Sequence, residues 1–203
     1  MSTRPETYLT PEEYLAHERK AEYKNEYFDG AIYAMTGASR EHNLIDTNII
    51  GELRQRLKGK PCEVYPSDMR IRIPSVGLYT YPDAVVVCGE PKFEDAHVDT
   101  LLNPTLVVEV LSPSTESYDR GKKFGYYRSI ESLAEYLLVA QDEHKVEQYV
   151  RQPDGRWLLS DIRTPEGVVE LVSVPAALPL REIYDRVVLP SSRAGEDTAT
   201  DIH

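Results

Sequence analysis

Two short apolar runs near the middle of the chain constrain its fold more than any other feature. They are Ala84-Val85-Val86-Val87-Cys88 and Leu106-Val107-Val108-Glu109-Val110-Leu111. Both are rich in β-branched residues and bounded by Pro or Gly, a pattern typical of central strands that are covered on both faces. The sequence therefore predicts a sheet with further elements packed on each side of it.

Helical patterns lie before and after these strands. Thr10-Pro11-Glu12-Glu13 predicts a helix start, because Thr is a fair N-cap, Pro suits the first helical position and Glu suits the positive end of the helix dipole. Ser39 can cap a second helix, which Gly59 and Pro61 would end and whose apolar stripe is Ile45, Ile49, Leu53 and Leu57. A third helix is expected over residues 119–130 and a short one over 180–184.

The remaining segments have mainly strand patterns. Asp29-Gly30 predicts the turn of a hairpin within residues 26–35, and residues 62–73 form one strand-like stretch. Further strands are expected at 136–140, 145–150, 157–162 and 167–172. Because helices and strands alternate over the first two thirds of the chain, we expect an α/β fold: a mixed β-sheet flanked by helices, with additional antiparallel strands toward the C-terminus.

Length and composition favour one globular domain over residues 1–190, followed by a disordered tail at 191–203. The sequence contains no run of about 18 apolar residues, so it predicts no membrane span. The segment from Met1 to Thr10 lacks an apolar signal region, so we expect a cytoplasmic location. The two cysteines, Cys62 and Cys88, fit a reducing compartment, and Cys88 is expected to be a small buried hydrophobe.

The charge of the chain opposes a nucleic-acid partner at first sight. The 23 basic and 34 acidic residues give a net charge of −11, whereas attraction to phosphate dominates nucleic-acid binding. Residues 51–72 are locally basic, with six Lys or Arg against three Asp or Glu, a balance of +3. This local excess of positive charge fits a surface that contacts phosphate. A solvated helix face and loop would give the same pattern, so both interpretations stay open.

An acid inside the second apolar run is the strongest chemical signal. An ionised Glu109 among apolar neighbours is costly unless it is paired or coordinated. Asp83 opens the other apolar run, directly after Pro82, so the two acids converge if their strands are neighbours. Two carboxylates with water and a substrate phosphate are the ligands that Mg²⁺ prefers. A turn cap at Asp83 and a buried ion pair at Glu109 are the alternative.

A lysine-containing helix follows the strand of Glu109. In Asp119-Arg-Gly-Lys-Lys, Lys123 lies one helical turn beyond Asp119 and can reach back over the carboxylates, to orient a water or to stabilise a charged phosphate. An exposed i, i+4 pair with Asp119 is the alternative.

Four stretches carry a resemblance to a known family: Glu26-Tyr-Phe-Asp-Gly (26–30), Tyr-Pro-Asp-Ala-Val-Val-Val (81–87), Val-Val-Glu-Val-Leu-Ser-Pro-Ser-Thr (107–115) and Asp-Arg-Gly-Lys-Lys (119–123). Over roughly residues 8 to 187 the chain resembles the Uma-two family of restriction-endonuclease-like proteins, which belongs to the PD-(D/E)XK nuclease superfamily. The resemblance implies a restriction-endonuclease-like fold.

The resemblance also implies site residues. Asp83 matches the motif's Asp and Glu109 its second acid, and the backbone carbonyl of Val110 is implied as a further metal ligand. The usual lysine position, two residues after the Glu, is Leu111 here. The lysine has moved to the following helix, which picks out Lys123 ahead of Lys122. Glu26 matches the family's early acid, which the resemblance places near the metal site. His42 on the second helix is a weaker candidate, since a lone helix histidine is usually a surface or core residue.

The leading hypothesis is a DNA endonuclease that uses Mg²⁺ or Mn²⁺ held by Asp83 and Glu109, with Lys123 assisting the attacking water. A nuclease-fold module that binds without cutting is the runner-up, supported by the net charge and the displaced lysine. A small-molecule hydrolase is a third alternative. A homodimer is left open.

Overall fold

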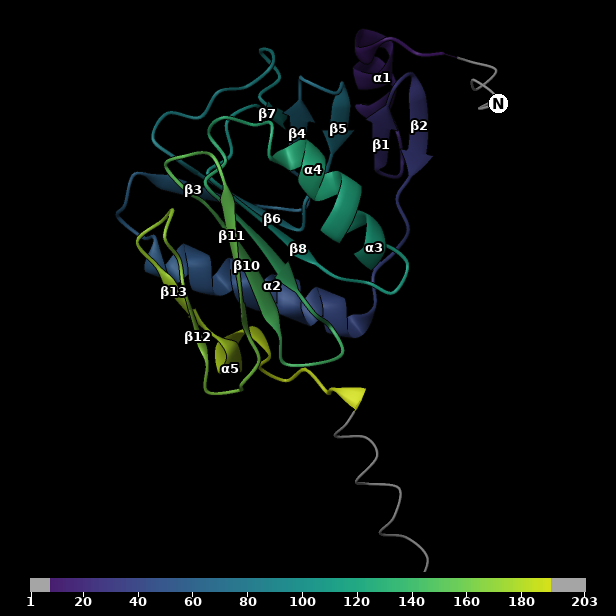
Figure 1. Cartoon of the computed structure of the whole chain (residues 1–203). Coiled ribbons are helices and arrows are strands. Elements are labelled where there is room, and N and C mark those ends of the chain that lie inside the picture. Colours follow the sequence, from purple (N-terminus) through teal and green to yellow (C-terminus); the bar gives the residue numbers. More distant parts are fainter. Residues whose placement is uncertain (1–7, 191–203) are drawn as a thin grey trace, which may run out of the picture.

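The computed structural model describes residues 8–190, and a six-stranded sheet lies at its centre (Figure 1). The strand order is β11-β10-β9-β8-β6-β3, where β8 and β9 are parallel and every other neighbouring pair is antiparallel. The bounds are β3 (Cys62–Pro66), β6 (Ala84–Cys88), β8 (Leu106–Val110), β9 (Glu135–Val139), β10 (Val146–Arg151) and β11 (Trp157–Ile162). The two apolar runs are therefore adjacent inner strands, as predicted.

One helix covers one face of this sheet. In α2 (Arg40–Arg56), the Ser39 hydroxyl accepts a hydrogen bond from the backbone N–H of His42 and caps the helix, as its sequence predicts. Three residues of its apolar stripe are fully buried: Ile45, Ile49 and Leu53. They pack with the residues of β6 and β8 that point to that side, among them Val86 and Val108. The stripe thus anchors α2 along the sheet.

A helical segment covers the opposite face. It consists of α3 (Glu116–Tyr118), a π-helical turn η1 (Asp119–Lys123) and α4 (Phe124–Tyr127). Its apolar side chains pack with the alternate residues of the central strands: Val85, Val107, Tyr136 and Leu138. The predicted helix over 119–130 is correct in place, but it begins three residues earlier and contains a π turn that no sequence pattern indicated.

A second sheet of five strands lies beside the first, in the order β2-β1-β5-β4-β7. Its strands are β1 (Asn25–Phe28), β2 (Ala31–Ala34), β4 (Arg70–Ile73), β5 (Leu78–Thr80) and β7 (Thr100–Leu101). The predicted single stretch 62–73 is wrong: a turn closed by the Met69 N–H on the Pro66 carbonyl separates β3 from β4, which belong to different sheets. The predicted hairpin turn at Asp29-Gly30 is confirmed, and both residues have positive φ.

The helices near both ends of the described residues lie where the sequence predicted them. Helix α1 (Pro11–Glu18) carries a capping box between Thr10 and Glu13. β12 (Val168–Glu170) and β13 (Ala177–Pro179) form a separate antiparallel pair, followed by α5 (Leu180–Ile183). The predicted disordered tail, 191–203, lies outside the described residues. Among residues 8–190, no helix has the length and apolar character needed to cross a membrane.

The two cysteines are joined in a disulfide, so the expectation of two reduced thiols is wrong for this structure. They are 26 residues apart in the sequence, but β3 and β6 run antiparallel and place Cys62 directly opposite Cys88. Sequence patterns alone could not supply that register. The bond fastens the outer strand β3 to the inner strand β6, while the cytoplasmic location stays a prediction.

The α2 stripe should contribute strongly to stability. Ile49→Ala is expected to lower the free energy of unfolding by about 2–5 kcal/mol, because a fully buried side chain is replaced by a cavity. Thr47→Ala, at an exposed position of the same helix, is the control and should change it by less than about 0.5 kcal/mol. Urea titration of both variants measures the difference, and equal small effects would contradict the packing described here.

Candidate active site

The two predicted carboxylates lie at the same end of neighbouring strands. β6 and β8 pair with Ala84 opposite Val108, which brings Asp83, just before β6, beside Glu109. The backbone N–H of Val110 donates a 2.7 Å hydrogen bond to Asp83 Oδ2. The adjacency that the sequence reasoning required is therefore present.

Glu109 is a buried carboxylate with two close donors. Its side chain is 5% exposed. Lys123 Nζ lies 2.8 Å from Oε1, and the Tyr127 hydroxyl donates to the same oxygen at 2.9 Å. Both contacts fall on one oxygen, so the other, Oε2, is left to a further ligand.

Lys123 stands among several acids. Besides Glu109, its ammonium group is 3.6 Å from Glu26 Oε1 and 3.6 Å from Asp119 Oδ1. Its side chain is 7% exposed, whereas Lys122 is an exposed residue. The structure thus brings Lys123, and not Lys122, to the predicted acids. Glu26, predicted as an early acid, also lies at this site.

The helical segment presents Asp119 and Lys123 together at its inner face. Both lie inside η1, and both are buried at the face that meets the sheet. π turns of this kind occur frequently at functional sites. Tyr127 follows four residues after Lys123, so it lies on the same face of the helical segment.

A hydroxyl from the five-stranded sheet also contacts the site. Thr80, at the end of β5, donates a short hydrogen bond to Glu26 Oε1. The contacts therefore join five side chains in a row: Thr80, Glu26, Lys123, Glu109 and Tyr127.

Helix α2 reaches the site from the other face of the sheet. His42 Nε2 is 3.4 Å from Asp83 Oδ2, the oxygen that already accepts from Val110. Asp46 lies one turn further along the helix, and its charge interacts with both Asp83 and His42. Within residues 8–190, His42 Nδ1 and Asp46 Oδ1 are buried without a hydrogen-bond partner. Asp46 escaped the sequence analysis, although its i, i+4 spacing from His42 could have indicated it.

Burial and crowding shift the ionisation of these groups. Burial raises the pKa of Glu109 well above its ordinary value, against the opposing effect of Lys123, and it also raises the pKa of Asp119. Burial alone would lower the pKa of Lys123, but Glu109, Glu26 and Asp119 outweigh it and raise that pKa well above its ordinary value. The lysine is therefore a firmly held cation in a region with an excess of acids.

The donor atoms suit a hard divalent cation. Asp83 and Glu109 each have one oxygen engaged by the protein, and carboxylate oxygens are the ligands that Mg²⁺ and Mn²⁺ accept. No three His, Cys, Asp or Glu side chains converge into a ready metal cage in the part of the chain that is described. Mg²⁺ commonly takes only one or two carboxylates and keeps several waters, so the pair still fits it.

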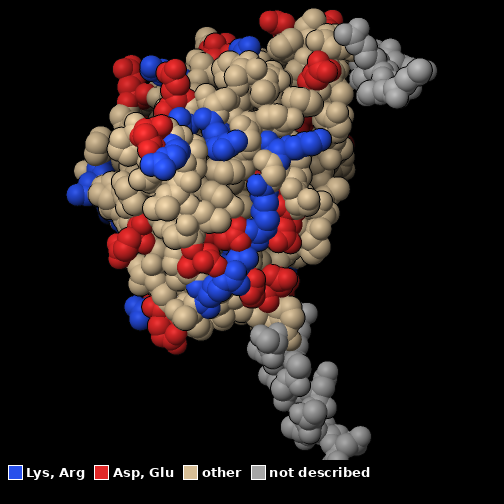
Figure 2. All heavy atoms as spheres, viewed as in Figure 1, with Lys and Arg blue, Asp and Glu red and all other residues tan. Residues whose placement is uncertain are grey.

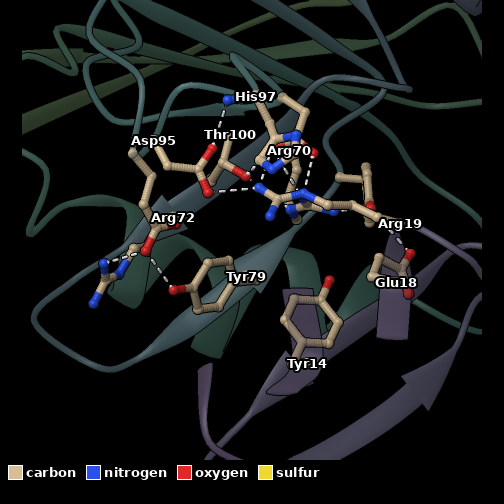
Figure 3. Close-up of polar contacts among 12 residues, drawn as sticks. Tyr14, Glu18, Arg19, Arg70, Arg72, Tyr79, Asp95, His97 and Thr100 are labelled. Carbon is tan, nitrogen blue, oxygen red and sulfur yellow. Dashed lines mark hydrogen bonds and ion pairs between the residues drawn. The ribbon is translucent and has the colours of Figure 1, made fainter. Parts of the chain in front are cut away.

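A second polar cluster, shown in Figure 3, has a different character. The buried Arg70 donates to Thr100 and to the Tyr81 hydroxyl and pairs with Asp99 at 3.1 Å. Arg19 of the segment after α1 pairs with the same Asp99 at 2.8 Å. These ion pairs fasten the segment after α1 to the five-stranded sheet, which gives the cluster a structural role.

The ionisation of Asp46 generates a pH-dependent prediction. Burial, and then the charge of Asp83, raise its pKa from 3.8 to about 7. The folded state therefore binds more protons than the unfolded state between these values, and stability falls as pH rises through that window. Asp46→Asn should be more stable than the wild type by about 1–2 kcal/mol at pH 8, after allowance for its partial exposure, and equally stable near pH 4.

Unfolding free energies at the two pH values test this, with Glu22→Gln as a control for the loss of one exposed negative charge. A gain for Asp46→Asn that is the same at both pH values would contradict a raised pKa.

Comparisons with known proteins agree with this fold. Residues 11–182 match the family model described as "Uma2: Putative restriction endonuclease". Two proteins of Synechocystis sp. (strain ATCC 27184 / PCC 6803 / Kazusa) are similar to the chain. "Uncharacterized protein sll1609" is 39% identical over 80% of this chain and 92% of its own length. "Uncharacterized protein slr1290" is 40% identical over 87% of this chain and 91% of its own length.

A crystal structure from Anabaena variabilis ATCC 29413, described as "a putative nuclease belonging to DUF820", shares the fold. Its TM-score is 0.73 at 18% identity, and the match covers 89% of this chain and 99% of that one. The likeness confirms the predicted restriction-endonuclease-like α/β architecture. Together with the family model, which spans most of the chain, it leads to one conclusion: the chain belongs to the Uma2 family of restriction-endonuclease-like proteins.

Proposed function

We propose that the protein is a metal-dependent nuclease that hydrolyses phosphodiester bonds of DNA at Asp83, Glu109 and Lys123. The observation that carries the proposal is the pair of carboxylates on neighbouring strands, each engaged through one oxygen, beside a buried lysine. Three further acids surround the pair of Lys123 and Glu109: Asp83, Asp119 and Glu26. A divalent cation would relieve this excess of negative charge.

Asp83 and Glu109 would hold Mg²⁺ or Mn²⁺, and the carbonyl of Val110 is proposed as a further ligand. The cation would acidify a bound water and neutralise charge on the scissile phosphate. Lys123, whose pKa is raised by its acidic neighbours, stays protonated. Its role is therefore electrostatic, stabilising the charge that develops on the phosphate. Glu26 sets the position of the lysine through their 3.6 Å contact.

The position of the lysine supports an active site over an inactive one. The residue two places after Glu109 is Leu111, which is buried in the apolar cluster below the helical segment. Lys123 nevertheless reaches Glu109 at 2.8 Å from that segment. Although Lys123 does not lie two residues after Glu109 in the sequence, it contacts the carboxylate of Glu109. This contact argues against a module that binds without cutting.

The surface places limits on how DNA would bind. On the face shown in Figure 2, basic side chains form a broken band that acidic side chains flank. The whole chain carries −11, so long-range attraction to DNA is weak and a divalent cation between protein and phosphate gains importance. A small-molecule phosphodiesterase using the same acids is the second candidate, favoured by this charge.

A cleavage assay tests the proposal. The wild type is expected to nick plasmid DNA with Mg²⁺ or Mn²⁺ and to be inactive with EDTA. Asp83→Asn, which keeps the size of the side chain, should lower the rate at least about 100-fold, since the cation loses a charged ligand. Metal-dependent cleavage that persists in Asp83→Asn, or none by the wild type on plasmid and single-stranded DNA, would refute a DNA nuclease at this site.

The two neighbouring lysines offer a matched comparison. Lys123→Met removes the buried ammonium group and should lower the cleavage rate at saturating Mg²⁺ by about 100-fold or more, a loss typical of a missing electrostatic group. Lys122→Met changes an exposed residue and should leave the rate within about twofold. Circular dichroism checks that both variants fold. Equal and small effects of the two substitutions on the cleavage rate would show that Lys123 has no part in the reaction.

A further inference from the structure

We infer that Tyr127 is a positioning residue, which fixes the Glu109 carboxylate so that Oε2 is presented to the divalent cation. The inference rests on the proposed function. Sequence reasoning treated Tyr127 only as a packing residue on the apolar side of its helix. The structure gives it a polar contact that packing does not require: its hydroxyl donates to Glu109 Oε1 at 2.9 Å.

Two donors on one oxygen restrict how the carboxylate can rotate. Lys123 Nζ approaches the same Oε1 at 2.8 Å. The lysine alone would hold Glu109 poorly, because its flexible stem also serves Glu26 and Asp119, each 3.6 Å away. The phenol of Tyr127 has only two side-chain torsions and donates its one hydroxyl hydrogen to Glu109, so it supplies the rigid half of the clamp.

Tyr127 is itself held on several sides. It is fully buried, and its ring packs against that of Tyr136 with a 5.4 Å separation of centroids. The phenol also carries no charge, so it orients the carboxylate without adding a second cation that would repel the metal. Hydrogen-bonded partners of metal ligands have this role in many metal sites.

The experiment compares Tyr127→Phe with Tyr136→Phe by calorimetric titration of Mn²⁺ into the full chain. Each variant removes one hydroxyl from the same aromatic core, but the Tyr136 hydroxyl donates to the backbone carbonyl of Asp119 at 3.3 Å and to no carboxylate. Tyr127→Phe should weaken Mn²⁺ binding about 10-fold or more, the usual loss for such a partner. Tyr136→Phe should stay within about twofold of the wild type.

Kinetics add a signature that a merely structural residue would not give. The cleavage rate of Tyr127→Phe should recover to nearly the wild-type value at saturating Mn²⁺, because Tyr127 touches the metal ligand and not the substrate. Circular dichroism checks that Tyr127→Phe and Tyr136→Phe both fold.

Two outcomes separate this inference from the proposed function. A wild-type protein that binds Mn²⁺, together with a Tyr127→Phe variant of equal affinity, overturns the positioning role alone. A wild-type protein that binds no Mn²⁺ overturns the metal site and, with it, the positioning role.

Discussion

The contact between Lys123 and Glu109 is the interaction on which the rest of the site depends. A carboxylate on the inner strand β8 and an ammonium on the covering helix meet at 2.8 Å in a region almost closed to water. Neither charge would be stable there alone, because an unpaired buried ion costs several kcal/mol. The pairing of these two buried charges fixes the helical segment over the end of the sheet, and with it the positions of Asp119 and Tyr127.

The site is assembled from both faces of the central sheet. The helical segment brings Lys123 and Tyr127 to Glu109 from one side, while α2 brings His42 to Asp83 from the other. Asp83 can serve both sides because it lies just before β6 begins. At that point its carboxylate reaches the backbone N–H of Val110 in β8. An acid at the middle of a covered strand would meet only one face.

Sequence reasoning located the central strands and the capped helices, and it singled out Asp83, Glu109 and Lys123, which the fold brings to one end of the central sheet. Each of these depends on local periodicity or on a charge placed among apolar neighbours. Sequence reasoning failed where the outcome depends on contacts between distant segments. The disulfide between Cys62 and Cys88 depends on the register of β3 with β6. The hydrogen bond from the Tyr127 hydroxyl to Glu109 depends on how the helical segment packs on β8, so the sequence indicated only an apolar role for Tyr127. Asp46 lies on an ordinary polar helix position, and only the packing of α2 brings its charge within reach of Asp83.

The π turn has a consequence for how this segment can change in length. The backbone from Asp119 to Lys123 carries a wider turn than an α-helix, so it holds one residue more than a regular turn would. Deleting one residue there would restore regular α-helix and leave the residues on either side close to their present faces. A deletion from the α-helical turns on either side would instead rotate everything beyond it by about 100° and turn either the aromatic anchor or the buried ammonium toward solvent. A change of length by one residue is therefore tolerated at the π turn itself, whereas the flanking turns are free to diverge only by substitution at exposed positions.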